Sequence, residues 1–295
     1  MAWQFVVFGR VLLGNIIGTA LLKRLMLQSP GVNPKRFLCW QFSFCLIFSL
    51  IYALIAGFTF RPMLWIVAGI GFLNSFGAYC QWRAIDMSLS KTSLFTQADD
   101  MISLFLCYWL LHETRFLNIG LVSGLILCFG AATLLMSKES NVRLIKFVIT
   151  YSVIWGVAGF LERYFAVSGI PFAEFLCSWY AGTLFGTLCI FFFSRETGLT
   201  FRLTKKEIKN IGIVAATAIW GGMVLGYWSA KLAPLTVYQP IFLVCEAVFP
   251  TLTGLIIFKE AKVLSRREIF AFFAGNHRRC RNHLQLSLIS PLLGR

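Results

Sequence analysis

The stretch Ser93–Glu113, SLFTQADDMISLFLCYWLLHE, has the length and apolar character of a membrane-spanning helix, yet it carries two adjacent carboxylates, Asp99 and Asp100. Burying one ionised side chain at mid-bilayer costs roughly 2.5–3.5 kcal/mol even on the most lenient scale. Because the whole chain holds only 12 acidic residues, a pair at this position indicates a functional site. The sequence on either side decides which kind of site it is.

The composition predicts an all-α polytopic membrane protein. Of the 295 residues, 58% are hydrophobic and 13% are charged, whereas soluble domains carry about 25% charged residues. The apolar segments reach helix length, which excludes a barrel. The net charge of +15 falls mainly in short loops, so it indicates topology and predicts no nucleic-acid partner. The scattered cysteines form no CxxC and accompany no His cluster, so neither a metal site, a cofactor nor a disulfide is predicted.

Apolar segments of about 20 residues, the length that a bilayer requires, recur along the chain. They fall at Trp3–Leu22, Phe37–Gly57, Met63–Trp82, Ser93–Leu111, Phe116–Met136, Leu144–Phe165, Phe172–Phe193, Ile208–Ala230 and Thr236–Phe258. No hydrophilic stretch between them is long enough to form a separate soluble domain. We therefore expect an integral, multi-pass protein in contact with the lipid bilayer along its whole length.

The segments form two similar series, which indicates an internal duplication. The fourth segment ends at Glu113 and the ninth at Glu260, and counting back equally from these glutamates reaches Asp99 and Glu246. We predict a first repeat of five helices over residues 1–138 and a second over residues 139–275. An odd number of helices per unit makes the two repeats inverted relative to each other.

The last helix of the second repeat is predicted to be incomplete. Its apolar character begins at Ile269–Gly275 and then gives way to an atypical basic tail, residues 276–295. Two interpretations stay open, a natural basic tail or a change of reading frame that replaced the tenth helix. The second would make this chain a defective copy. A function predicted from the sequence would then describe its relatives better than this chain.

Basic residues concentrate in alternate loops, among them Lys35-Arg36, Lys205-Lys206 and Arg266-Arg267. The positive-inside rule places these loops in the cytoplasm and the N-terminus outside. The expected location is the plasma membrane, with a bacterial inner membrane favoured. A homodimer is left open.

The chain resembles the drug/metabolite transporter superfamily, and within it the EamA-like ten-helix transporters. The residues that carry the resemblance are the helix ends WLLHETRF (109–116) and IIFKEAKVLSRREI (256–269), with the turns RAIDMSLSKTSLF (83–95) and AKLAPLTVYQPIF (230–242). The resemblance implies two inverted five-helix repeats around a central cavity that carries small solutes. The chain departs from the pattern in its missing tenth helix and its Asp99-Asp100 pair.

The candidate solute- or proton-binding residues are Asp99, Asp100, Glu246 and Arg10. At helical spacing one aspartate shares a face with Thr96 and Ser103, and because neighbours point about 100° apart, we expect one aspartate to face the cavity. Burial favours the neutral form of an acid, which allows a proton and a cationic solute to compete. The alternative is an acid paired with Arg10 without solute contact. Further cavity-lining candidates are Gln239, Tyr238 and Trp228, whereas Glu162 is predicted to be interfacial and Glu113 to make helix-end contacts.

The leading hypothesis is a secondary transporter, an exporter or exchanger, that carries a small metabolite or drug by alternating access, with proton coupling through the membrane carboxylates. One alternative is a non-transporting or degenerate membrane protein. Another is a membrane-embedded enzyme, since an aspartate pair can hold magnesium and a diphosphate. That chemistry needs further acids one turn away, where this helix has Ser103 and Leu104. No GxSxG, HExxH or P-loop occurs, so the protein is predicted not to be an enzyme.

Overall fold

The computed structural model describes residues 2–28, 33–89, 92, 97–113, 142–193 and 203–259. These residues are mostly helical and contain no strand. The predicted segment Phe116–Met136, residue Thr96 and the predicted tail 276–295 lie outside them. The all-helical prediction is confirmed for the part of the chain that is described.

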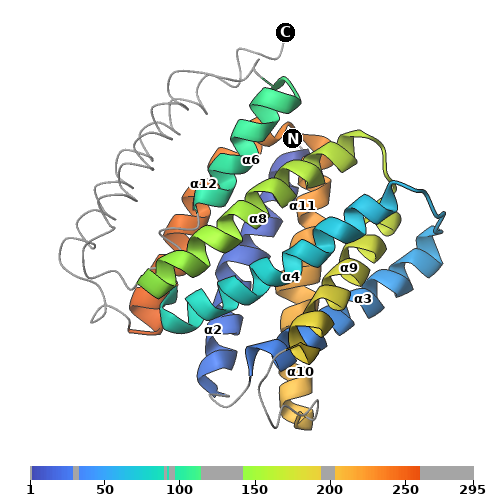
Figure 1. Cartoon of the computed structure of the whole chain (residues 1–295). Helices are drawn as coiled ribbons and strands as arrows, with labels where there is room; N and C mark the ends of the chain where they lie inside the picture. Colours follow the sequence, from blue (N-terminus) through green and yellow to red (C-terminus); the bar gives the residue numbers. More distant parts are fainter. Residues whose placement is uncertain are drawn as a thin grey trace.

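The described helices pack against one another in one bundle (Figure 1). Their bounds are α1 Ala2–Arg10, η1 Val11–Gly18, α2 Thr19–Gln28, α3 Pro34–Ala56, α4 Leu64–Met87, α6 Gln97–Leu110, α8 Val142–Val167, α9 Phe172–Phe192, α10 Lys205–Val214, η3 Ala215–Trp220, α11 Gly221–Leu232, α12 Leu235–Leu252 and η4 Thr253–Ile257. The elements marked η are π-helical stretches: η1 and η3 lie inside longer helices, and η4 ends the helix that begins with α12. Such turns occur frequently at functional sites.

Five helices among the described residues are long and apolar enough to cross a membrane. They are Trp3–Leu27, Pro34–Ala56, Val142–Val167, Phe172–Phe192 and Lys205–Leu232. In a bilayer every backbone polar group must find a partner inside the protein, and a helix satisfies this within its own segment. These five spans indicate a membrane-embedded protein. The predicted segments Met63–Trp82, Ser93–Leu111 and Thr236–Phe258 correspond to α4, α6 and α12–η4.

Local sequence fixes where the long helices begin and end. The side chain of Asn33 accepts a hydrogen bond from the backbone N–H of Lys35 (2.9 Å), and Pro34 occupies the first helical position of α3. This is the favoured start of a helix. Helix α3 ends at Gly57, whose φ of +86° is a conformation that suits glycine. Helix α10 begins with a capping box between Thr204 and Glu207.

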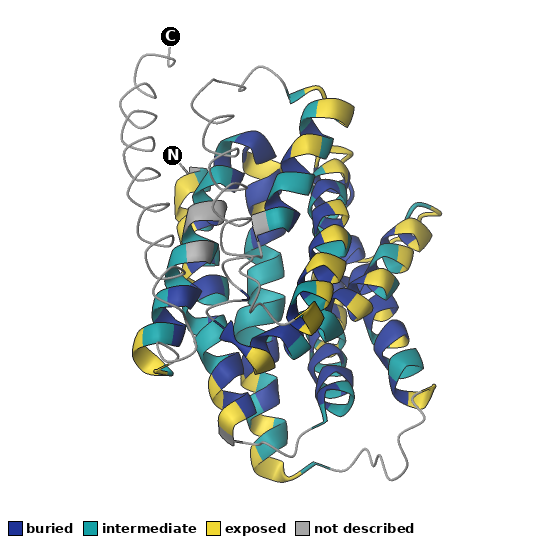
Figure 2. Cartoon of the chain, turned by 60° about the vertical axis from the view of Figure 1, so that its left-hand side comes forward, coloured by how far each residue is buried: buried dark blue, intermediate teal, exposed yellow. Residues whose placement is uncertain are grey.

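Many large apolar residues are exposed on the outside of the bundle, and Figure 2 marks the exposed positions along the helices. Leu54 is 87% exposed, Phe193 85% and Ile55 80%. In water such side chains would be a liability, but hydrocarbon chains solvate them. The exposed surface therefore agrees with a lipid environment.

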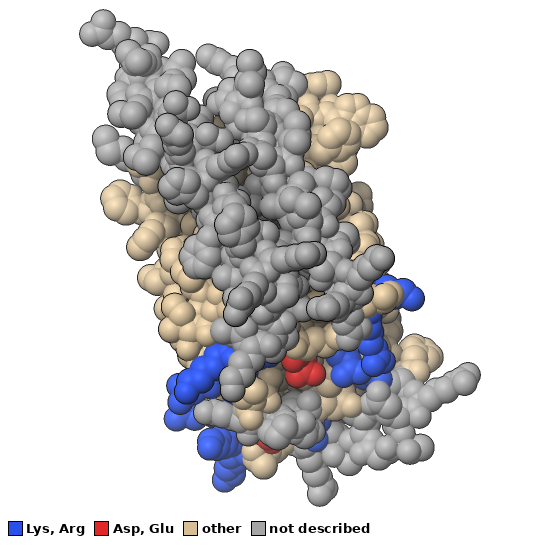
Figure 3. Space-filling view, turned by 90° about the vertical axis from the view of Figure 1, so that its left-hand side faces the viewer, with Lys and Arg blue, Asp and Glu red and all other residues tan. Residues whose placement is uncertain are grey.

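Charged side chains are distributed unevenly. On the face drawn in Figure 3, Lys and Arg gather at the lower end, which is the end where α2 finishes and α10 begins in Figure 1. Lys23, in the middle of α2, donates hydrogen bonds from Nζ to the backbone carbonyl of Ile85 (2.9 Å) and, more weakly, to that of Asp86 (3.4 Å). A cation at the end of α4 is favourable because the helix dipole is negative there.

The most extensive helix contact joins α4 and α9. A Cβ added to Gly71 would overlap the carbonyl of Trp179, and one added to Gly182 would overlap the carbonyl of Ala68. Glycine at these two positions therefore lets the two backbones touch, a device common between membrane helices. The side-chain amide of Asn74 donates to Thr183 Oγ1 across the same interface (3.3 Å). We call this contact the α4–α9 seam.

Candidate functional site

A cavity of about 300 Å³ lies between the helices of the bundle. Both predicted repeats line it: η1, α3, α4 and α6 from the first, and α8, α9, η3, α11 and α12 from the second. A volume of this size suits a small-molecule ligand. The charged residues among its described lining are Arg10, Asp99, Asp100, Glu162 and Glu246.

Three carboxylates meet in the cavity wall. Asp99 and Asp100 come from α6 and Glu246 from α12, and one oxygen of each lies within 4.8 Å of the other two. Asp99 is 7% exposed and Asp100 5%. The expectation that one of the two aspartates faces the cavity is wrong, because both line it. We call Asp99, Asp100 and Glu246 the acidic cluster.

Hydrogen bonds hold the aspartates in place but do not satisfy them. Asp99 Oδ1 accepts from the backbone N–H of Asp100 (3.0 Å). Asp100 Oδ1 accepts from the side-chain amide of Gln239, about one turn into α12. Asp100 Oδ2 is buried and has no hydrogen-bond partner among the described residues. A buried, unpartnered charged oxygen is costly, so it calls for a positively charged or hydrogen-donating ligand.

Prolines interrupt the helix that carries Glu246. Pro240 and Pro250 both lie inside α12. Proline has no N–H, so Pro250 cannot donate to the carbonyl of Glu246, four residues earlier. Beyond Pro250 the chain continues into the π-helical turn η4. Glu246 therefore sits in a part of α12 where the regular hydrogen-bond ladder is broken.

Arg10 reaches the same cavity from the junction of α1 and η1. Its guanidinium carbon lies 4.3 Å from the centre of the Phe242 ring, a cation–π distance. Its electrostatic neighbours include Glu162, Glu246 and Asp100. Gly226 leaves room for it, because a Cβ there would lie 2.8 Å from Glu162 Oε1 and 3.1 Å from Arg10 Nη1. Arg10 thus has both Glu162 and members of the acidic cluster as electrostatic neighbours.

Glu162 is the residue that the sequence reasoning misplaced. It was expected at the interface because it lies near the end of an apolar segment, but α8 extends to Val167, and Glu162 is 8% exposed and lines the cavity. Its Oε1 has no hydrogen-bond partner among the described residues. The feature of the sequence that points to this position is the helical spacing of Glu162 from Ala158 and Gly159, two small residues that line the same cavity.

The other predicted cavity residues divide clearly. Ser103, Tyr238 and Gln239 line the cavity. Ser103 also donates to the carbonyl of Gly156 (2.8 Å), which ties α6 to α8. Trp228 is corrected: it is 49% exposed and is not among the lining residues. It follows Tyr227, whose burial turns the next residue of the helix away from the interior.

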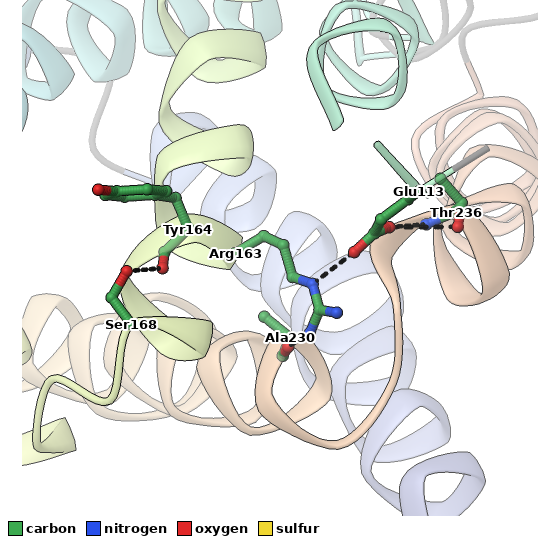
Figure 4. Close-up of polar contacts among 6 residues, drawn as sticks. All are labelled: Glu113, Arg163, Tyr164, Ser168, Ala230 and Thr236. Atoms are coloured by element: carbon green, nitrogen blue, oxygen red, sulfur yellow. Dashed lines mark hydrogen bonds and ion pairs between the residues drawn. The ribbon is translucent and has the colours of Figure 1, made fainter. Parts of the chain in front are cut away.

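A second polar group lies at the C-terminal end of α6 (Figure 4). Arg163 Nε donates to Glu113 Oε1 (2.9 Å), and Arg163 Nη1 donates to the carbonyl of Ala230. Glu113 Oε2 accepts from the hydroxyl of Thr236 (3.2 Å) and more weakly from its backbone N–H (3.4 Å). The acid therefore joins the end of α6 to the start of α12, in agreement with the helix-end contacts expected for Glu113. We call Glu113, Arg163 and Thr236 the helix-end bridge.

Comparisons with known proteins define the fold but no function. No family model matches the chain, and no curated protein matches it. A solved structure described as "Crystal structure of protein" is similar over 100% of this chain and 99% of its own, with a TM-score of 0.70 and 14% sequence identity. At this identity the likeness concerns the fold alone.

Proposed function

We propose that the protein is a secondary transporter that carries a small metabolite or drug across the plasma membrane by alternating access, as an exporter or exchanger. The observation that carries the proposal is the acidic cluster, which brings carboxylates from both halves of the chain to one central cavity. Acids buried at membrane depth are expensive and are a mark of solute and ion pathways.

The pattern of helix contacts supports two inverted repeats. The first contains α1–η1–α2, α3, α4 and α6, and the second contains α8, α9, α10–η3–α11 and α12. Helix α6 contacts α8, and its counterpart α12 contacts η1. Likewise α4 contacts α8 and α9, while its counterparts α11 and η3 contact α1 and α3, respectively. When the helices of the first repeat are exchanged for their counterparts in the second, each of these contacts corresponds to another contact that is present.

Under the same exchange, the contact between α6 and α12 maps onto itself, and the acidic cluster lies in that contact. A site on the symmetry axis of two inverted repeats is open to both halves as they rock, which is the arrangement that alternating access needs. The π-helical turns η1 and η3 and the prolines of α12 interrupt helices around the same cavity. Interrupted helices are typical of transporter binding sites.

The proposed solute is a small molecule that presents positive charge or hydrogen-bond donors to the acids. Proton coupling through these acids stays a prediction from the sequence, as do a bacterial inner membrane and a homodimer. The gathering of Lys and Arg at one end of the face in Figure 3 supports placing that end in the cytoplasm.

A solute screen in reconstituted vesicles tests the proposal. The full chain, Asp100→Asn and the control Asp86→Asn are compared for uptake of labelled small metabolites and drugs, with and without a pH gradient. Asp86 is exposed at the end of α4, so its variant makes the same chemical change outside the cavity. We expect at least one solute that the wild type and the control carry and Asp100→Asn does not. Chemical conversion of a solute would instead favour the membrane-embedded enzyme, and no uptake at all would favour a non-transporting protein.

A further inference from the structure

The cavity lining is strongly unbalanced in charge. Its described residues include four carboxylates, those of Asp99, Asp100, Glu162 and Glu246, against the one guanidinium of Arg10. With every acid ionised, the sum is a net charge of −3. Like charges this close in a low-dielectric site repel strongly, so these acids are neutralised either by protons or by bound positive charge that the described side chains of the cavity do not supply.

The acidic cluster has the dimensions of a cation site. Its three carboxylate oxygens lie within 4.8 Å of one another. Ca²⁺ takes oxygen ligands at 2.3–2.6 Å in a flexible geometry, whereas Mg²⁺ demands near-ideal octahedral geometry at 2.0–2.1 Å. Three carboxylates brought together from two helices therefore suit the less demanding coordination of Ca²⁺ better than that of Mg²⁺.

Clustering alone would not indicate a ligand, but two further observations do. Asp100 is 5% exposed, and its Oδ2 has no hydrogen-bond partner among the described residues although the side chain lines the cavity. Glu162, 8% exposed, lines the same cavity, and its Oε1 is likewise without a hydrogen-bond partner among the described residues. Amide and carboxylate oxygens are the ligands that hard cations prefer.

The chemistry of this donor set excludes softer metals. No cysteine or histidine lines the cavity among the described residues, so thiolate- and imidazole-seeking metals find no ligand. Charge then separates the hard cations, because a divalent ion cancels two of the three net negative charges and Na⁺ cancels one. With a divalent ion bound, the acidic cluster, the ion and Arg10 sum to zero charge. The one remaining negative charge is that of Glu162, which lies beside Arg10.

We propose that Asp99, Asp100 and Glu246 form a binding site for a divalent hard cation, of which Ca²⁺ fits best. The sequence alone does not reveal this site. The positions one turn after the aspartates on α6 hold Ser103 and Leu104, and the third acid comes from another helix, α12. The site requires no transport, so binding and transport are tested separately.

Binding is measured on the full chain in detergent with Ca²⁺ alone, by equilibrium dialysis and by thermal unfolding, with Mg²⁺ and Na⁺ in parallel. We expect saturable binding of one Ca²⁺ per chain, and a melting temperature that rises by about 5 °C at 100-fold excess over Kd. Because ligand charge sets affinity for Ca²⁺, Asp100→Asn and Glu246→Gln should each bind at least about tenfold more weakly. Asp86→Asn is the matched control and should bind as the wild type does.

Glu246 and Asp100 lie on different helices, so if one of the two variants does not fold, the other still reports the effect of a lost carboxylate on Ca²⁺ binding. Unfolding without Ca²⁺ adds a second reading, since removal of one repelling charge should leave each variant at least as stable as the wild type. Equal Ca²⁺ binding by the wild type and both variants would overturn the proposal. So would a wild type that takes only Na⁺, or one whose melting temperature responds to pH but not to Ca²⁺ or Mg²⁺.

Discussion

The α4–α9 seam and the contact between α6 and α12 both join apolar helices but are built in opposite ways. In the seam, Gly71 and Gly182 bring backbones into touch, and the polar pair Asn74 and Thr183 satisfies itself. In the α6–α12 contact, carboxylates face one another and α12 is broken by two prolines. The seam is organised for close backbone packing, whereas the acidic contact leaves a buried carboxylate oxygen, Asp100 Oδ2, without a hydrogen-bond partner among the described residues. This difference marks the second region as the one organised for a ligand.

Added side-chain volume in the α4–α9 seam should destabilise the folded protein. A Cβ at position 182 would overlap the backbone of Ala68, and backbone cannot rotate away as a side chain can. We expect Gly182→Ala to lower the free energy of unfolding by about 3 kcal/mol, measured by thermal unfolding in detergent. Gly69→Ala is the control on the facing helix, where nothing lies within 4 Å of an added Cβ, and it should be neutral or stabilising by up to about 1 kcal/mol. Equal stability of the two variants would contradict close backbone contact.

The helix-end bridge tests whether polar contacts outside the acidic cluster are structural. Arg163 and Glu113 are 12% and 10% exposed, so removing the cation leaves a largely buried carboxylate without its ion pair. We expect Arg163→Gln to lower the free energy of unfolding by roughly 2–3 kcal/mol, below the range for fully buried pairs because some water reaches this one. Lys231→Gln, an exposed cation on α11, should change it by less than about 0.5 kcal/mol.

If the Arg163 and Lys231 variants unfold at the same temperature, the ion pair contributes nothing measurable. The bridge would then belong with ordinary surface pairs, and the comparison between a structural and a functional polar region would lose its structural example.

The smallest effect is expected at Ser103, which lies one turn from the acidic cluster but points its hydroxyl at the carbonyl of Gly156 (2.8 Å). Loss of this hydrogen bond in Ser103→Ala should cost about 1 kcal/mol in thermal unfolding. Thr150→Ala is the control, because its exposed hydroxyl bonds within its own helix. A stability loss with transport retained assigns Ser103 to packing, whereas loss of transport at full stability would make it part of the binding site.

The sequence was sufficient for the helical class and for the acidic cluster, because charged residues inside apolar segments are costly enough to stand out one by one. The equal spacing back from Glu113 and Glu260 paired Asp99 with Glu246, and the two carboxylates do meet. Periodicity could not place Glu162 or Trp228, because the depth and rotation of a helix depend on its neighbours. Linear position put Glu162 at the interface, and α8 carries it into the cavity wall.

Transport by Asp100→Asn, set against the amount of folded protein, tests the central claim most directly. Uptake of a solute that the wild type carries is measured in vesicles, and the folded fraction is taken from gel filtration of the same preparation. We predict that Asp100→Asn is folded and as stable as the wild type but transports at least about tenfold more slowly, the factor that 1.4 kcal/mol of lost binding gives. Unchanged transport by both Asp100→Asn and Glu246→Gln would contradict a functional role for the acidic cluster.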